Sequence, residues 1–157
     1  MKKILFMIHD LGPGGAEKVL VNLVNNMNKQ KWNITVMALF GGGVNEQFLN
    51  PGIKLINAHK KTIRGNSHIM KLFSPKTLFN FYVKGQYDVI VSYLEGPCAR
   101  IVSGCSKEGV KKLGWIHIQQ KSKEGVCRSF RNYQEAVECY NRFDQLVGVS
   151  NFVCETF

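Results

Sequence analysis

The first residues that could bind a charged ligand form a glycine-rich turn, Gly12-Pro13-Gly14-Gly15, between an apolar run and an amphipathic segment. The apolar run, 4–8, has the length of a core strand, and apolar residues recur at helical spacing after the turn. In such a strand–turn–helix unit, the free N–H groups of the first helical turn point over the end of the strand and attract anions. Gly14 and Gly15 are therefore candidate ligands for a phosphate or carboxylate. The alternative is that they only form a tight turn.

Two well-known phosphate loops do not fit this turn. A G-x-G-x-x-G motif that begins at Gly12 needs glycine at position 17, which is Glu17. A P-loop needs G-K-[ST] where this chain has Glu17-Lys18-Val19. The strand expected at 33–40 is followed by three glycines and not by the acid that holds a ribose in dinucleotide-binding proteins. The sequence thus argues against a dehydrogenase and against a P-loop NTPase.

Ionisable side chains follow or flank other expected strand ends. They are His117, near the end of a strand expected at 110–118, and Asp10, Lys18, Glu95 and Lys121. Since ligands of parallel α/β sheets bind beyond the carboxyl ends of the strands, these residues are candidate substrate contacts. Each has an alternative as a surface, capping or structurally hydrogen-bonded residue. Asp10 and Glu95 are the only acids at strand ends in the front half, which does not suggest a paired-carboxylate glycosidase.

Length and composition predict one globular domain over 1–157, with 45% hydrophobic residues. No apolar run reaches the roughly 18 residues of a membrane span, and the run after Lys2-Lys3 stops at His9-Asp10, too soon for a signal peptide. We therefore expect a cytoplasmic protein. The five cysteines contain no C-x-x-C pair and are expected to be reduced thiols, mostly buried, without a metal site.

The net charge of +10 is concentrated in the middle of the chain, where no acid occurs between Glu46 and Asp88. This one-signed field predicts an anionic partner, and an anionic membrane surface that docks on residues 54–84 is our specific hypothesis. The alternative is a solvated basic face. Nucleic acid is not expected, because no reader motif is present and the aromatic residues have core spacing rather than that of a stacking platform: Phe73, Phe79, Phe81 and Tyr82.

Strands that alternate with helices must position these residues. We expect strands at 4–8, 32–40, 53–56, 88–94, 110–118 and 145–149, with 57–75 as loop or partly helical. The first helix is expected to bury Ala16, Val19, Leu20, Leu23, Val24 and Met27, and later helices to begin after Ser74 and Ser150 as N-caps. The predicted fold class is α/β: a doubly wound, mostly parallel Rossmann-like sheet with helices on both faces.

Four motifs occur in order along the chain: 14–19 (GGAEKV), then 87–92 (YDVIVS), then 114–117 (GWIH), then 146–151 (LVGVSN). In this order they resemble the amino-terminal half of glycosyltransferase family 4, whose members are retaining enzymes built from two Rossmann-like domains in the GT-B fold. The resemblance implies that 1–157 is a truncated acceptor-binding domain. It also implies that the carboxyl-terminal domain, which binds the nucleotide sugar through an E-x7-E motif, is absent from this chain, and that the fragment alone is inactive.

The resemblance also assigns roles to the candidate residues. Gly14 and Gly15 would meet the diphosphate of the donor, and His117 would be the catalytic residue beside the sugar. Asp10, Lys18, Glu95 and Lys121 would contact the acceptor. The implied reaction moves a hexose-type sugar, with retention, from a nucleotide-diphosphate sugar to a glycan or lipid-linked cell-envelope acceptor at the inner membrane face, such as a precursor of lipopolysaccharide or capsule, without cofactor or metal.

Two other function classes remain as alternatives. One is a stand-alone flavodoxin-like module that binds an anionic small molecule, against which the lack of an acidic cluster around Asp10 argues. The other is a basic nucleic-acid-binding domain. A downstream E-x7-E motif in the same reading frame is the observation that would favour the transferase.

Overall fold

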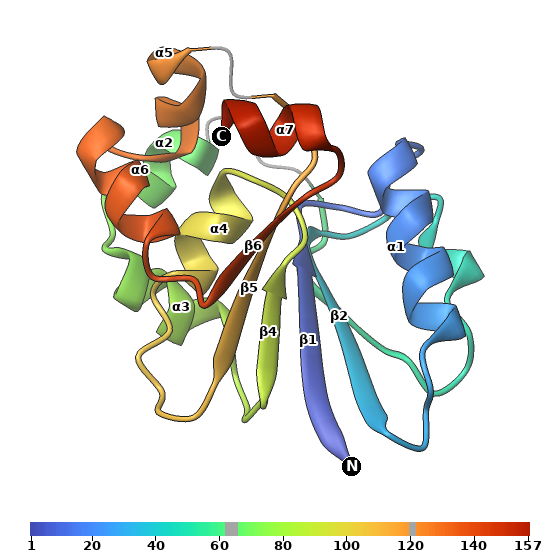
Figure 1. The fold of residues 1–157 in the computed structure, drawn as a ribbon. Coiled ribbons are helices and arrows are strands. Elements are labelled where there is room, and N and C mark those ends of the chain that lie inside the picture. Colours follow the sequence, from blue (N-terminus) through green and yellow to red (C-terminus); the bar gives the residue numbers. More distant parts are fainter. Residues whose placement is uncertain (62–65, 120–121) are drawn as a thin grey trace.

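The computed structural model describes residues 1–61, 66–119 and 122–157, which form one six-stranded sheet flanked by helices (Figure 1). The strands are β1 (Lys2–Ile8), β2 (Trp32–Phe40), β3 (Lys54–His59), β4 (Val89–Ser92), β5 (Lys111–Ile116) and β6 (Gln145–Gly148). The α-helices are α1 (Gly15–Asn26), α2 (Asn66–Lys71), α3 (Pro75–Tyr82), α4 (Pro97–Val102), α5 (Lys123–Val126), α6 (Tyr133–Tyr140) and α7 (Asn151–Thr156). Two short 3₁₀ helices are η1 (Glu46–Phe48) and η2 (Cys127–Ser129).

The sheet is parallel throughout, in the order β3-β2-β1-β4-β5-β6. The chain winds outward from β1 in one direction through β2 and β3, and in the other through β4, β5 and β6. This order confirms the predicted doubly wound, Rossmann-like α/β fold. All carboxyl ends of the strands lie at the upper edge of the sheet in Figure 1, and the first turn of α1 lies at the same edge.

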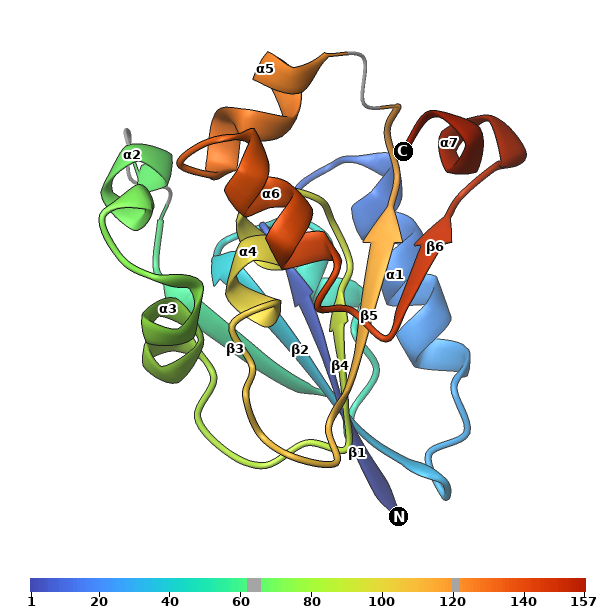
Figure 2. The same cartoon turned by 60° about the vertical axis from the view of Figure 1, so that its left-hand side comes forward.

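The apolar run of β1 is buried on both faces of the sheet. Ile4, Phe6 and Ile8 face α1, whereas Leu5 and Met7 face the side covered by α3 and α4 (Figure 2). Alternate residues of a strand point to opposite faces, so a central parallel strand must be apolar at nearly every position. A third apolar cluster joins the end of β5 to α4, α6 and α7.

Two helix starts predicted from N-cap residues are confirmed. The side chain of Ser74 accepts a hydrogen bond from the N–H of Thr77 at 3.1 Å, and Pro75 begins α3. The side chain of Ser150 accepts from the N–H of Val153 at 3.2 Å at the start of α7. In both, a hydroxyl satisfies an N–H that has no partner within the helix.

Several predicted positions were wrong. Val19 is 55% exposed, because α1 packs through Leu20, Val21 and Val24 and this rotates Val19 away from the sheet. Phe73 and Phe81, expected in the core, are exposed. Phe73 lies in the turn before α3, outside the helix, and Phe81 lies away from the face of α3 that buries Leu78 and Phe79.

Strand β3 is longer than predicted, since residues 57–59 continue its pairing with β2. All five cysteines are free thiols, and Cys98, Cys105 and Cys139 are buried. None of the helices within the described ranges has the length and apolar character needed to cross a bilayer.

Candidate functional site

A cleft of about 980 Å³ lies beyond the carboxyl ends of β1, β4 and β5. Its walls come from the residues that follow these three strands, from the first turn of α1, and from α5, η2 and Tyr140. The sheet reverses its winding direction between β1 and β4, and open α/β sheets bind ligands in the crevice at this switch point. The fold and the cleft therefore define the chain as a doubly wound α/β protein with a candidate binding site at its switch point.

Asp10 shapes the loop that leads from β1 to the cleft. Its Oδ1 accepts a hydrogen bond from the N–H of Gly12 at 2.8 Å, and its Oδ2 lies 2.8 Å from Nδ1 of His9. Both side chains are partly exposed at the cleft. On the other side of the loop, the Asn45 side chain donates to the carbonyl of Gly12, and the N–H of Asn45 donates to the carbonyl of Leu11. The loop is thus fixed from both sides.

The glycines at the start of α1 are not required by the backbone conformation. Gly14 is the N-cap with φ −71° and ψ 163°, and no side chain caps the helix. Gly15 also lacks a positive φ, and an added Cβ there would meet no atom within 4 Å. Both glycines are exposed, and the next two residues, Ala16 and Glu17, line the cleft. The first turn of α1 therefore has uncovered space in front of it.

Glu17 occupies part of this helix terminus. Its carboxylate folds back against Gly14, where it would collide with an added Cβ. A negative charge in the first turn is favourable because the amino end of a helix carries partial positive charge. An anion that binds at this turn would compete with the Glu17 carboxylate.

Glu95 connects the segments that follow β4 and β5. Its Oε1 accepts hydrogen bonds from the backbone N–H of His117 and, at 2.6 Å, of Ile118. These two N–H groups belong to the residues that directly follow β5, where no neighbouring strand supplies an acceptor. Glu95 lines the cleft, and it also positions His117.

The ring of His117 packs among aromatic side chains. Its centroid lies 4.9 Å from that of Tyr93 and 6.2 Å from that of Trp115. Burial lowers the pKa of His117, while the Glu95 carboxylate, a backbone hydrogen bond at Tyr93 and the more distant Glu17 oppose this shift. The ring is therefore neutral at pH 7, with one nitrogen that can donate and one that can accept.

Two buried polar atoms have no hydrogen-bond partner in the described part of the chain, Nε2 of His117 and the hydroxyl of Tyr93. Burial, together with the nearby Glu17, raises the pKa of Tyr93 to about 12, so the hydroxyl keeps its proton. Unpaired buried polar groups are rare in folded proteins and call for a strained or functional explanation. The two rings are adjacent: His117 lines the cleft, and the fully buried Tyr93 lies beside it.

The predicted site residues fall into three groups. Asp10, Glu95 and His117 line one cleft, and the exposed Gly14 and Gly15 directly precede Ala16 and Glu17, which also line it. Lys18 lies on another side of α1, at a separate hollow of about 480 Å³ beside Asn25 and Phe48. Lys121 lies outside the described residues.

Sequence reasoning missed Glu17 as a residue of the cleft and Tyr93 as the buried ring beside His117. Glu17 carried a signal, an acid in the first turn of a helix that begins with glycine. Tyr93 carried none, since a tyrosine near the end of a buried strand is ordinary. Within the described ranges, no group of three histidine, cysteine or acidic side chains could hold a metal ion.

A scan against protein-family models and a search of curated proteins found no match for this chain.

Proposed function

We propose that this chain is the acceptor-side half of a glycosyltransferase. The reaction moves a hexose-type sugar from a nucleotide-diphosphate sugar to a glycan or lipid-linked acceptor, with retention. The enzyme works at the cytoplasmic side of the cell envelope, and its donor is held mainly by a second domain.

The observation that carries this proposal is Gly15, a glycine at the start of α1 that the backbone conformation and packing do not require. Gly15 has neither a positive φ nor a neighbour that excludes a side chain, so folding alone does not call for glycine there. A glycine does allow a ligand to approach the backbone closely. Because α1 is twelve residues long and has no side-chain cap, its first N–H groups suit a diphosphate brought in by a partner domain, which would displace the Glu17 carboxylate.

The opposite wall of the cleft supports the same reaction. His117 is neutral and has an unpartnered nitrogen, so it can exchange a hydrogen bond with a sugar hydroxyl. Asp10 is partly exposed in the same cleft and can accept from hydroxyl groups of the acceptor. In retention of this kind the leaving diphosphate takes the acceptor proton, so no second carboxylate is needed as a base.

Sugar transfer by the full-length protein tests the proposal. Labelled nucleotide-diphosphate hexoses are supplied with a membrane extract as the source of acceptor, and incorporation into glycan or lipid is counted. His117→Ala should lower turnover at least ~100-fold through loss of transition-state contacts. Lys31→Ala is the control, because Lys31 is exposed just before β2, at the end of the strands opposite the cleft, and it should leave turnover within about twofold of wild type.

Two outcomes would contradict the proposal. Unchanged turnover in His117→Ala removes His117 from the mechanism. Absence of transfer from every hexose donor, together with tight binding of a free mononucleotide or pyrophosphate by the 1–157 chain, favours the alternative of a flavodoxin-like module for anionic small molecules.

A further inference from the structure

Large apolar side chains are exposed on α2 and in the turn before α3. Leu72 is 76% exposed, and Ile69 and Phe73 are each about half exposed. These three residues lie within five consecutive positions, and we call them the apolar tip. Single exposed apolar residues are ordinary on protein surfaces, but a group of this kind marks an interaction site.

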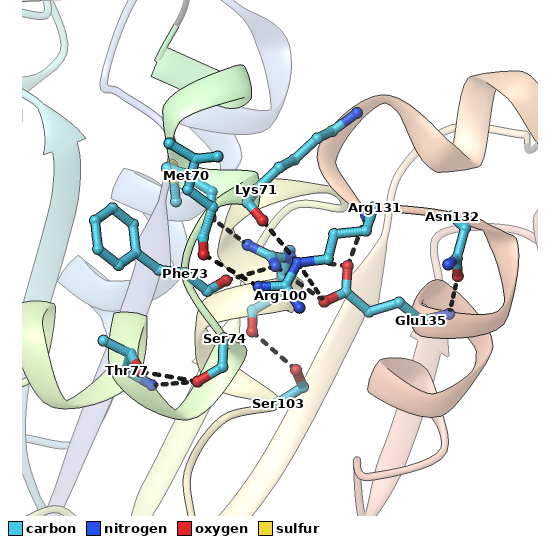
Figure 3. A network of polar contacts seen from close by, with 11 residues as sticks. Met70, Lys71, Phe73, Ser74, Thr77, Arg100, Ser103, Arg131, Asn132 and Glu135 are labelled. Carbon is cyan, nitrogen blue, oxygen red and sulfur yellow. Dashed lines mark hydrogen bonds and ion pairs between the residues drawn. The ribbon is translucent and has the colours of Figure 1, made fainter.

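The backbone beneath the apolar tip is fully supplied with hydrogen-bond donors. Arg100 donates to the carbonyls of Met70 and Phe73 at 2.7 and 2.8 Å (Figure 3). Arg131 donates to the carbonyls of Lys71 and Leu72 at 2.7 and 3.2 Å. The last carbonyls of a helix normally depend on water or a cap. Here two guanidinium groups take the place of water at four consecutive carbonyls.

Glu135 holds the two arginines in place. Its carboxylate lies 2.9 Å from Arg100 Nη2, and it accepts the backbone N–H of Arg131 at 2.6 Å. Arg100 is fully buried. Burial alone would raise the pKa of Glu135, but hydrogen bonds and charge from the two arginines outweigh this and lower it. The carboxylate therefore stays ionised, and the tip is attached to a rigid base.

We propose that the apolar tip inserts into the headgroup region of an anionic membrane. In an apolar medium every unsatisfied carbonyl is unfavourable, and the two arginines leave none unsatisfied at residues 70–73. Lys71, Lys76 and the partly exposed Arg131 lie around the tip, and the sequence has no acid between Glu46 and Asp88. Cations beside exposed apolar side chains match a surface of anionic headgroups over hydrocarbon.

A lipid surface fits this feature better than a protein partner does. Three apolar side chains cover far less than the roughly 800 Å² that each partner buries in a standard protein interface. Insertion into lipid needs no matching shape, and a few apolar residues with several cations suffice for reversible binding.

The basic residues at 54–84, which we expected to form one membrane-binding surface, lie at two different ends of the sheet. Lys54 and Lys84 line a hollow with Lys3 at the amino-terminal end of the strands. By contrast, α2 lies toward the same end of the sheet as the cleft (Figure 1). Membrane binding is inferred independently of the proposed function, which only explains its use: a lipid-linked acceptor would meet the enzyme near the cleft.

Sedimentation with lipid vesicles tests this surface. Phosphatidylcholine vesicles with and without phosphatidylglycerol are compared at low and at raised salt. We expect binding to the anionic vesicles alone, weaker at raised salt. Leu72→Ser should weaken it at least about fivefold, since the largest exposed apolar contact is lost. Phe48→Ser is the control, because Phe48 is 58% exposed on η1 and should not affect binding.

A second measurement separates insertion from attraction of charges. In Leu72→Trp, tryptophan emission should shift to shorter wavelength when anionic vesicles are added, whereas in Phe48→Trp the shift should be absent. Equal binding by Leu72→Ser and wild type, equal binding to neutral vesicles, or binding to RNA or protein without binding to vesicles would each overturn the inference. The vesicles contain no sugar acceptor, so a negative result leaves the transfer proposal intact and a failure of transfer leaves this result intact.

Discussion

The carboxylate of Glu95 accepts a hydrogen bond from the backbone N–H of His117 and so ties the loop after β4 to the end of β5. The same oxygen also accepts from Ile118. One side chain therefore fixes the position of the histidine that faces the cleft.

Replacement of Glu95 by alanine should destabilise the protein, because two backbone N–H groups lose their acceptor. We expect Glu95→Ala to lower the free energy of unfolding by about 1–3 kcal/mol, measured by urea denaturation. Glu95→Gln keeps a carbonyl oxygen at the same place and should retain most of the stability. Equal losses in the two variants would show that the hydrogen bonds do not carry the effect.

The neutral state of His117 should make stability depend on pH. Burial lowers the pKa of His117 below its ordinary value of 6.5. As the pH falls below about 6.5, the unfolded chain therefore takes up a proton that the folded chain does not, and stability decreases. Between about pH 7.5 and 5.5, wild type should lose more unfolding free energy than His117→Gln, measured by urea denaturation at each pH. Parallel losses would mean that His117 does not contribute.

The buried ion pair between Arg100 and Glu135 should be costly to break from one side. Arg100→Met removes the guanidinium that pairs with the Glu135 carboxylate and donates to two carbonyls, and we expect a loss of about 3–5 kcal/mol in the free energy of unfolding. The double variant Arg100→Met/Glu135→Gln should lose less than the sum of the single variants, because the uncompensated charge is gone. Additive losses in this double-mutant cycle would contradict a direct coupling.

Two glycines should respond oppositely to alanine. A Cβ on Gly43 would collide with the backbone of Leu11, which cannot move without disturbing the loop before α1, so Gly43→Ala should cost about 2 kcal/mol or more. Gly15→Ala meets open space and should be neutral or stabilise by up to about 1 kcal/mol. Thermal unfolding of the two variants measures both effects.

In the full-length protein, Gly15→Ala should nevertheless reduce sugar transfer, because the methyl group takes the space proposed for the diphosphate. Full activity in this stable variant would remove the argument from Gly15.

The fold was predictable because its signals are local. The unbroken apolar run of β1 predicts a central strand. Ser74 and Ser150 precede helices at positions where a hydroxyl can cap them. The sequence was less informative about which residues of a helix face the sheet. The sequence does not distinguish Val19 from Val21 as the inward residue of α1, since that depends on how the helix rolls against the sheet.

The contacts that shape the site are long-range, and this limited prediction. Glu95 was recognisable as a cleft residue from its place after a strand, but its hydrogen bonds reach His117 across 22 positions. Arg100 lies in the short apolar helix α4. An arginine among apolar residues indicates a buried partner, but the sequence does not show which residue that is. The partners, Glu135 and the carbonyls of 70 and 73, lie 27 to 35 positions away.

The pairing of β1 with β4 joins residues 85 positions apart, as the hydrogen bond from the N–H of Lys3 to Asp88 shows. During synthesis one edge of β1 stays open until β4 has been made, for roughly 4 to 17 s at ribosomal rates of about 5–20 residues per second. An apolar strand with an open edge is a template for aggregation. A strand in the middle of the finished sheet is therefore an open edge in the nascent chain.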